Sequence, residues 1–237
     1  MNTSKIRLTK KIAIGVLSVG LAFQSCGDYF DVGNNPNLVT EPNVNSLLAS
    51  TTHRVGMNAY RYGSAVANYA QYIASPTAAS ATDIYDITDL SNSWSQAYYG
   101  MSDATDMVRL AEEAGADLHV GVGKLLIAYQ LSLVFDTWGS VPYTEAFNKV
   151  ETFRPAYDAP EQVYATIGQL IDEAITALGS TDATMELEPD LDVIHEGDVE
   201  RWVRTAYGLK ARHLNKLTRK ASYDPEAVLA ALVSWFR

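Results

Sequence analysis

The chain has 237 residues, of which 47% are hydrophobic and 19% are charged, and its formal net charge is −10. That length and apolar content are sufficient for a buried core and exclude a disordered or collagen-like chain. The negative charge gives no general attraction to nucleic-acid phosphates, so nucleic-acid binding is not expected. A single cysteine can form neither an internal disulfide nor a multi-cysteine zinc site.

The first 25 residues have the layout of an export signal. Four basic residues and no acid precede an uncharged apolar run from Ile12 to Phe23, after which Gln24 and Ser25 lead to Cys26. The run is shorter than the about 20 residues that a membrane-spanning helix needs. A cysteine in this place resembles a bacterial lipoprotein signal, although Phe23 and Gln24 depart from the strict lipobox. We predict that residues 1–25 are removed and that Cys26 is lipidated; an ordinary buried thiol is the alternative.

Residues 26–43 are predicted to form a tether between the lipid anchor and a folded domain. The stretch is rich in Asn, Asp, Gly and Pro, and the pairs Asn35-Pro36 and Glu41-Pro42 favour turns or extended backbone. After it the apolar residues recur at spacings of three and four, which is the period of an amphipathic helix. Residues 44–237 are therefore predicted to form one helical domain.

Alternation of the strand kind is almost absent from this domain, so the predicted fold class is all-α, with antiparallel helix pairs. Gly56 and Gly63 interrupt the first helical pattern, so two short helices are expected there. The predicted helices are 46–60, 64–73, 94–108, 118–133, 158–179, 198–220 and a last one from Asp224. The longer loops, in which ligand contacts are often found, are 74–93, 139–158 and 180–197.

Three of the predicted helices have start signals. Asp158 is expected to cap the helix that Gly179 ends, with Glu161 closing a capping box. Asp198 is the predicted cap of the next helix, and the pair Asp224-Pro225 combines a cap with a proline in the first turn of the last one.

Two short motifs imitate functional signatures and are rejected. Gly121-Val122-Gly123-Lys124 is similar to the end of a phosphate loop, but Leu118 and Leu125 stand where Gly and Ser or Thr are required. His195-Glu196 lacks the second histidine of a zinc protease helix, because Val199 occupies that place. The histidines have no ligand spacing and the cysteine belongs to the signal, so no metal site, cofactor or catalytic thiol is predicted.

Carboxylates are abundant, and a glycosidase needs two of them across a sugar bond. No spacing favours one pair among the candidates, which are Asp83, Asp86, Asp136 and Glu145. The seven acids within residues 186–200 are followed by a helix with many bases, which favours mutual charge compensation. A calcium site in this acidic loop lacks the ordered pattern of a calcium-binding loop.

Aromatic residues are the remaining sign of a ligand site. The chain has 14 Tyr and 4 Trp, and flat rings with a polar edge suit the weakly apolar faces of sugars. Trp94 and Tyr98 directly follow the 74–93 loop, although their helical spacing also fits core packing. Tyr85 lies inside the loop, where no helical stripe explains it.

Four blocks stand out in chain order. They are VFDTWGSVPYTEAF (134–147), YDAPEQVY (157–164), DVIHEGDVERW (192–202) and LKARHLNKL (209–217). Together with the N-terminal signal they resemble the SusD/RagB family of nutrient-binding outer-membrane lipoproteins. The first block is similar to the family's FGDVPYSEA segment with Trp138 in place of Phe or Tyr, and the third has His195 in place of Tyr. In the first block we expect a structural turn, with Asp136 and Glu145 bonding to nearby amides.

The resemblance implies tetratricopeptide-like helix pairs in a surface-exposed lipoprotein of the outer membrane. Such a protein binds glycans or other nutrients without cleaving them and delivers them to a SusC-like TonB-dependent transporter. Members are about twice this length, so the chain looks like an N-terminal half. The predicted ligand residues are Asp83, Tyr85, Asp86 and Trp94. A surface glycoside hydrolase and a helical protein-binding adaptor are the alternatives.

Overall fold

The computed structural model describes residues 42–148 and 153–236. The chain divides into two compact units, Met1–Pro42 and Asn43–Arg237, and all the described helices lie in the second unit. The predicted signal 1–25, the lipidated Cys26 and nearly all of the tether 26–43 lie outside the described residues.

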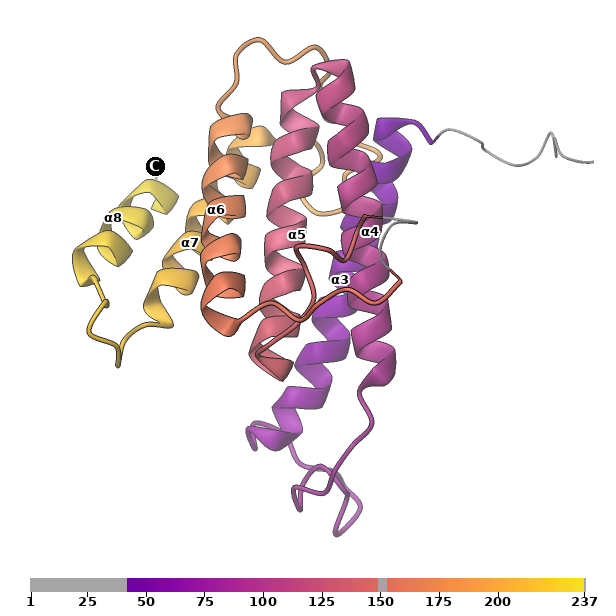
Figure 1. The fold of residues 1–237 in the computed structure, drawn as a ribbon, viewed down its shortest axis with the longest axis vertical. Coiled ribbons are helices and arrows are strands. Elements are labelled where there is room, and N and C mark those ends of the chain that lie inside the picture. The colour runs from indigo at the N-terminus through magenta and orange to yellow at the C-terminus, as the bar shows by residue number, and fades with distance from the viewer. Residues whose placement is uncertain (1–41, 149–152, 237) are drawn as a thin grey trace, which may run out of the picture. The chain divides into compact units, whose positions relative to one another are not determined.

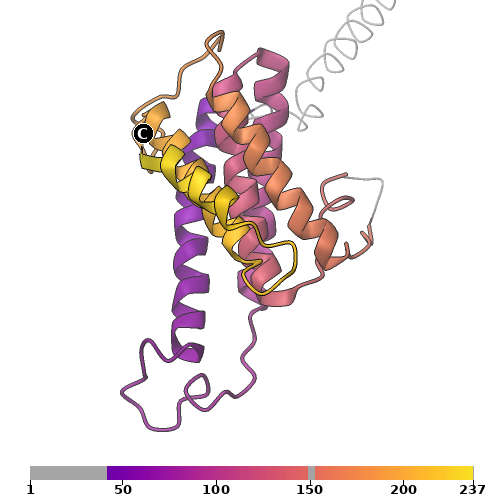
Figure 2. The same ribbon diagram turned by 90° about the vertical axis from the view of Figure 1, so that its left-hand side faces the viewer.

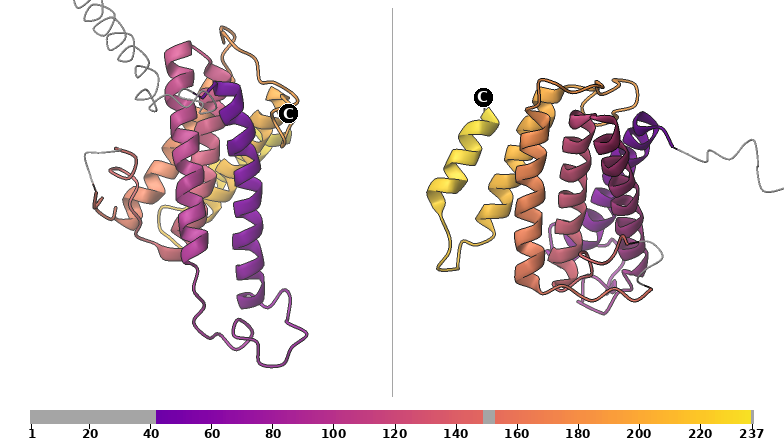
Figure 3. Two further views of the ribbon diagram at one scale, coloured as in Figure 1. Left: turned by 90° about the vertical axis from the view of Figure 1, so that its right-hand side faces the viewer. Right: turned by 45° about the horizontal axis from the view of Figure 1, so that its top comes forward.

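The described residues form six α-helices and no strand, apart from one isolated bridge between Val141 and Asp158, so the all-α prediction is confirmed. The helices are α3 Val44–Tyr69, α4 Ser91–Ala114, α5 Asp117–Trp138, α6 Pro160–Leu178, α7 Val199–Asn215 and α8 Pro225–Phe236. From α4 to α8 each helix packs against the next one in the chain, and α3 packs against α4 and α5. Figure 1 and the right-hand view of Figure 3 show these neighbours side by side.

Helix α5 is the centre of the core, because α3, α4, α6 and α7 all contact it. Among the described helices it alone is long and apolar enough to cross a membrane by length and composition, but most of its surface is buried by its neighbours. Its glycines allow this close packing. A Cβ at Gly121 would lie 2.6 Å from Cγ of Leu178, and one at Gly123 would lie 2.5 Å from a methyl of Val108.

The segment that imitates a phosphate loop is therefore the interior of a core helix. Lys124 extends from it to the carboxylates of Glu173, at 2.9 Å, and Glu112, at 3.5 Å. These ion pairs join α5 to α6 and α4, so the rejection of a phosphate-binding role has a structural reason.

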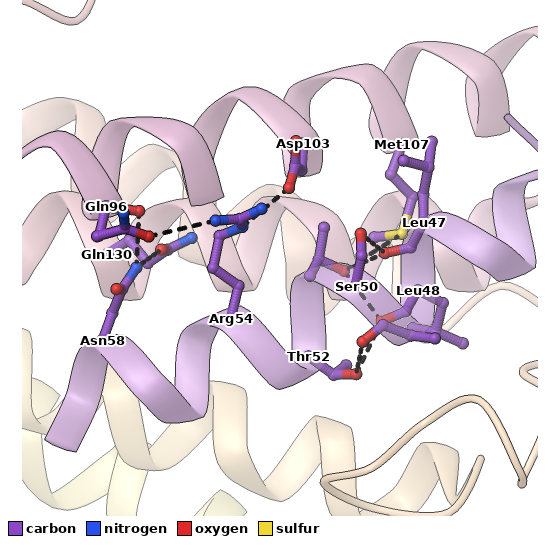
Figure 4. Close-up of polar contacts among 12 residues, drawn as sticks. Leu47, Leu48, Ser50, Thr52, Arg54, Asn58, Gln96, Asp103, Met107 and Gln130 are labelled. Carbon is purple, nitrogen blue, oxygen red and sulfur yellow. Dashed lines mark hydrogen bonds and ion pairs between the residues drawn. The ribbon is translucent and has the colours of Figure 1, made fainter. Parts of the chain in front are cut away.

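Helix α3 corrects the prediction of two short helices, because it runs unbroken through Gly56 and Gly63. An interior glycine costs about 1 kcal/mol relative to alanine, and contacts to α4 and α5 offset that cost. Part of this interface is polar (Figure 4). Asn58 Nδ2 donates to Oε1 of Gln130 at 2.7 Å, and Nε of Arg54 lies 2.9 Å from Oδ2 of Asp103.

The capping predictions were right for two helices and wrong for one. Asp198 accepts a hydrogen bond from the Arg201 amide at 3.0 Å, and Asp224 accepts from the amides of Glu226 and Ala227. Helix α7 ends at Asn215, five residues before the predicted Lys220. Helix α6 has Ala159 at its N-cap and no side-chain cap, so the predicted capping box at Asp158 does not form.

Candidate functional site

The two long acidic loops lie at opposite ends of the helical layer (Figures 1 and 2). The 180–197 loop follows α6 and contacts the turn between α4 and α5, where the Thr184 amide donates to the carbonyl of Gly115. The segment between α3 and α4, residues 70–90, lies at the other end together with the segment between α5 and α6. These two ends differ in how they use their carboxylates.

In the 180–197 loop one acid is fully buried, so charge compensation with helix α7 does not account for every acid of this run. Asp192 has no exposed area and accepts four hydrogen bonds. The indole Nε1 of Trp202 donates at 2.6 Å, and the amides of Ile194, His195 and Gly197 each donate at 3.1 Å. Asp192 therefore fixes the loop onto helix α7.

The predicted charge compensation between this loop and helix α7 holds only near the start of the helix. Arg201 pairs there with Asp198 at 3.1 Å. Farther along, Lys210 lies 2.7 Å from Asp172 of α6, and Lys216 lies 2.7 Å from Asp136 of α5. The bases of α7 thus join neighbouring helices.

At the opposite end, three aromatic rings line a pocket of about 650 Å³. They are Trp94 in the first turn of α4, Trp138 at the end of α5, and Tyr157 just before α6. The rest of the lining is mainly hydroxyl groups and one carboxylate. These residues are Thr88, Asp89, Leu90, Ser91, Ser95, Thr137 and Ser140.

The three rings form a connected group that leads from the core to the surface. Trp94 lies perpendicular to Trp138 with centroids 5.0 Å apart, and Trp138 meets the buried Tyr62 edge-on at 6.0 Å. On the outer side Tyr157 stacks on Trp94 at 6.3 Å and 27°. Tyr157 is 64% exposed, so one aromatic face is available to a ligand on a well-supported base.

The segment between α5 and α6 holds Tyr157 beside the start of α4. The carboxylate of Asp158, which does not cap its own helix, accepts from the amides of Tyr143 and Thr144 at 2.9 and 2.8 Å. Tyr98 of α4 donates its hydroxyl to the carbonyl of Pro142 at 2.7 Å. These bonds connect α4 with both sides of the segment and so fix the rings relative to each other.

Of the two carboxylates expected to bond to nearby amides in this segment, one does so. Glu145 accepts a hydrogen bond from the Ala156 amide at 3.0 Å, as predicted. Asp136 does not bond to a nearby amide; it forms a bidentate pair with Lys216 at 2.7 and 2.8 Å, because helix α7 brings that ammonium group to it.

The charge of the pocket comes from Asp89. Its carboxylate accepts hydrogen bonds from the Ser91 amide at 2.8 Å and the Ser91 hydroxyl at 3.1 Å. These bonds hold the pKa of Asp89 below its ordinary value, so the group is ionised near neutral pH. None of the described residues that line the pocket is Lys, Arg or His.

The structure places only one of the four predicted ligand residues, Trp94, in this pocket. Asp83 accepts from the Ser75 amide at 2.8 Å, and Asp86 accepts from the amide of Ile87. Tyr85 is 60% exposed and its ring lies 6.3 Å from that of Tyr69. These three residues belong to the outer part of the 70–90 segment and do not line the pocket.

Sequence reasoning missed the other members of the pocket, namely Asp89, Trp138 and Tyr157. A signal was present for the two rings, because Trp138 directly precedes the 139–158 loop and departs from the usual residue of the resembled motif, and Tyr157 lies near the end of that loop. The sequence did not show that this loop contacts the start of α4. In residues 42–148 and 153–236 no three His, Cys, Asp or Glu side chains converge as a metal site would require.

A second cavity of about 460 Å³ lies between α3, α5 and α7. Its lining is mostly apolar, including Leu125, Leu126 and Trp202. Because a polar nutrient needs hydrogen-bonding groups as well as apolar surface, the ring and hydroxyl pocket is the stronger candidate for a nutrient site.

Solved structures with this helical arrangement come from several related bacteria. A SusD/RagB family protein from Bacteroides thetaiotaomicron matches with a TM-score of 0.68 and 20% identity, over 82% of this chain and 42% of its own. SusD homologues from Parabacteroides distasonis and Bacteroides fragilis match with TM-scores of 0.66 and 0.63, at 20% and 22% identity. Each of these two matches covers 82% of this chain, and 39% and 40% of the respective homologue.

These likenesses establish the fold. Residues 36–235 also match the SusD-like family described as starch-binding and associating with the outer membrane. The chain belongs to this SusD-like family, as the sequence blocks predicted. It spans about two fifths of the length of the similar structures, and no curated protein matches it.

Proposed function

We propose that the protein binds a glycan at the cell surface and delivers it to a TonB-dependent transporter of the outer membrane. The observation that carries the proposal is the pocket of Trp94, Trp138 and Tyr157. Its volume of about 650 Å³ is within the range of small-molecule sites, which is roughly 300 to 1,000 Å³. Rings supply apolar surface for a sugar face, and the hydroxyl groups around them supply hydrogen bonds.

The positions of the carboxylates support binding of the glycan without cleavage. A glycosidase needs two carboxylates facing one sugar bond, but among the described residues Asp89 is the one carboxylate in the pocket lining. The candidates considered from the sequence have other partners: Asp136 pairs with Lys216, and Glu145 holds the Ala156 amide. Asp83 and Asp86 bond within their own segment.

Membrane attachment through Cys26 is the second part of the proposal. It rests on the order of basic start, apolar run and cysteine in residues 1–26 and on family membership. Several acyl chains at about 0.8 kcal/mol per buried methylene would anchor the protein firmly. Cys26→Ser should release the protein from membranes, whereas an intact mass that includes Met1 in a membrane-extracted sample would contradict lipidation.

Calorimetric titration of the full chain tests the binding function. The probes are four neutral oligosaccharides: maltohexaose, cellohexaose, laminarihexaose and mannohexaose. We expect at least one to bind and to remain uncleaved after prolonged incubation, as judged by reducing ends. New reducing ends would favour the hydrolase alternative. Co-purification with a large β-barrel transporter would support delivery, and partners without any sugar binding would favour the adaptor alternative.

A further inference from the structure

The position of Tyr157 determines where a sugar can lie in the pocket. Carbon atoms in contact are about 3.5 to 4.0 Å apart, so a sugar between two parallel rings needs a ring separation of about 7 to 8 Å. The centroids of Trp94 and Tyr157 are 6.3 Å apart, which leaves no room between them. A sugar must therefore lie on the outer face of Tyr157 or against the exposed ring edges, next to the polar rim.

The polar rim is negatively charged. Asp89 lines the pocket as an ionised carboxylate, and both of its oxygens are oriented by Ser91. Two further carboxylates flank the tyrosine: Asp158 is its chain neighbour, and Glu145 bonds to the Ala156 amide. Among the described residues no cationic side chain lines the pocket, and Arg154, three residues before Tyr157, is exposed and lies outside the lining.

We propose that this pocket selects neutral sugars over anionic ones, and that Asp89 is the residue that determines this selectivity. The inference rests on the proposed glycan-binding function and specifies its substrate class. A uronate or sulfated sugar on the face of Tyr157 would bring a negative charge close to the Asp89 carboxylate without a counter-charge. Hydroxyl groups of a neutral sugar can instead donate to that carboxylate in charge-assisted hydrogen bonds.

The proposal is tested with matched pairs of ligands on the full chain. Each of the four neutral hexasaccharides is titrated beside the same oligosaccharide oxidised at C6 to carboxylates. At low salt we expect the neutral form to bind about tenfold or more tightly than the oxidised form, because like charges a few ångströms apart repel strongly at a protein surface. The preference should shrink as salt screens the charges.

Asp89→Asn is the decisive variant, because asparagine has the same shape and keeps an acceptor for the Ser91 amide. We expect it to reduce the preference for neutral ligands to about threefold or less. Asp86→Asn is the control: it removes the same charge three residues away, outside the pocket lining. It should leave the preference unchanged.

The outcomes separate the two proposals. If the oxidised ligands bind as tightly as the neutral ones, or if Asp86→Asn acts like Asp89→Asn, the selectivity assigned to Asp89 is wrong while glycan binding stands. If none of the eight oligosaccharides binds, the glycan-binding function itself is wrong.

Discussion

The two acidic ends of the helical layer look alike in sequence and behave differently in the structure. Both the 70–90 segment and the 180–197 loop contain several acids and no Lys or Arg. In the second, Asp192 is buried and fixes the loop to Trp202 of α7. In the first, Asp83 and Asp86 bond within their own segment, and Asp89 bonds to Ser91 at the start of α4 and lines an aromatic pocket.

The difference shows that acid content alone does not define a site. A carboxylate surrounded by indole and amide donors stabilises a loop, whereas one next to exposed rings can contact a ligand. We therefore expect substitutions in the 180–197 loop to change mainly the stability of the protein, and substitutions in the 70–90 segment to change mainly ligand binding. Each of the following measurements tests this difference.

The largest effect is expected for Asp192→Ala. The change leaves the indole N–H of Trp202 and three amides without their buried acceptor, so it should lower the free energy of unfolding by about 3 to 5 kcal/mol. Urea denaturation measures this loss. Asp190→Ala, at an exposed position two residues earlier, should change stability by less than about 0.5 kcal/mol. Similar losses of stability for both variants would contradict the conclusion that Asp192 fixes the loop onto helix α7.

Acid should destabilise the helical layer through two buried histidines. Burial lowers the pKa of His119 to about 4, and burial together with the nearby Lys216 lowers that of His213 to about 4. Below about pH 6.5 the unfolded chain takes up protons at both residues while the folded chain does not, so stability falls with pH down to about 4. Each histidine should contribute a loss of about 2 kcal/mol between pH 7 and pH 5.

The pH effect can be assigned by substitution. His213→Phe keeps a ring stacked on Tyr164 and removes one titrating group, so the loss between pH 7 and pH 5 should shrink by about 2 kcal/mol. The exposed His53→Gln variant is the control for replacing a histidine outside the core. An unchanged slope in His213→Phe would show that other groups cause the acid sensitivity.

Substitutions in the aromatic pocket should change ligand affinity more than protein stability. Tyr157→Ala removes an exposed ring, so it should weaken the tightest oligosaccharide by about tenfold or more and move the melting temperature by no more than about 2 °C. Trp94→Ala should weaken binding and also lower the melting temperature, because its ring packs against Trp138 and Tyr98. Full binding by Tyr157→Ala would place the site elsewhere.

The smallest effect is expected at the outer part of the 70–90 segment. Tyr85→Ala should weaken binding of a hexasaccharide by only a few fold, about 1 kcal/mol or less, and leave the melting temperature unchanged, because the ring is exposed and outside the pocket. The same titrations and melts measure it. A loss as large as that of Tyr157→Ala would extend the site to Tyr85, Asp83 and Asp86, as the sequence predicted.

Much of the fold could be predicted because helical period and local caps are properties of neighbouring residues. Asp198 and Asp224 bond to amides two or three positions along the chain, and both were predicted. The two wrong predictions of hydrogen-bond partners, for Asp158 and Asp136, involve residues that are far away in the chain. Asp158 bonds to Tyr143 and Thr144 across a loop, and Asp136 pairs with Lys216 across two helices.

The same reason explains why the sequence indicated only one ring of the candidate pocket. Trp94 could be predicted because it follows a long loop, but its partners Trp138 and Tyr157 are 44 and 63 residues away in the chain. The packing of α4 against α5 and the bonds from Asp158 to Tyr143 and Thr144 bring the three rings together. The spacing of these residues along the chain does not predict that contact.

Hydrogen–deuterium exchange of the full chain, with and without the tightest neutral oligosaccharide, tests the division between the two ends most directly. Ligand binding slows exchange where it stabilises backbone hydrogen bonds. We predict slower exchange in peptides covering residues 88–98, 137–144 and 156–160, and no change in peptides covering 185–202. Protection confined to residues 185–202, with none around Trp94 and Tyr157, would contradict the assignment of binding to the aromatic pocket.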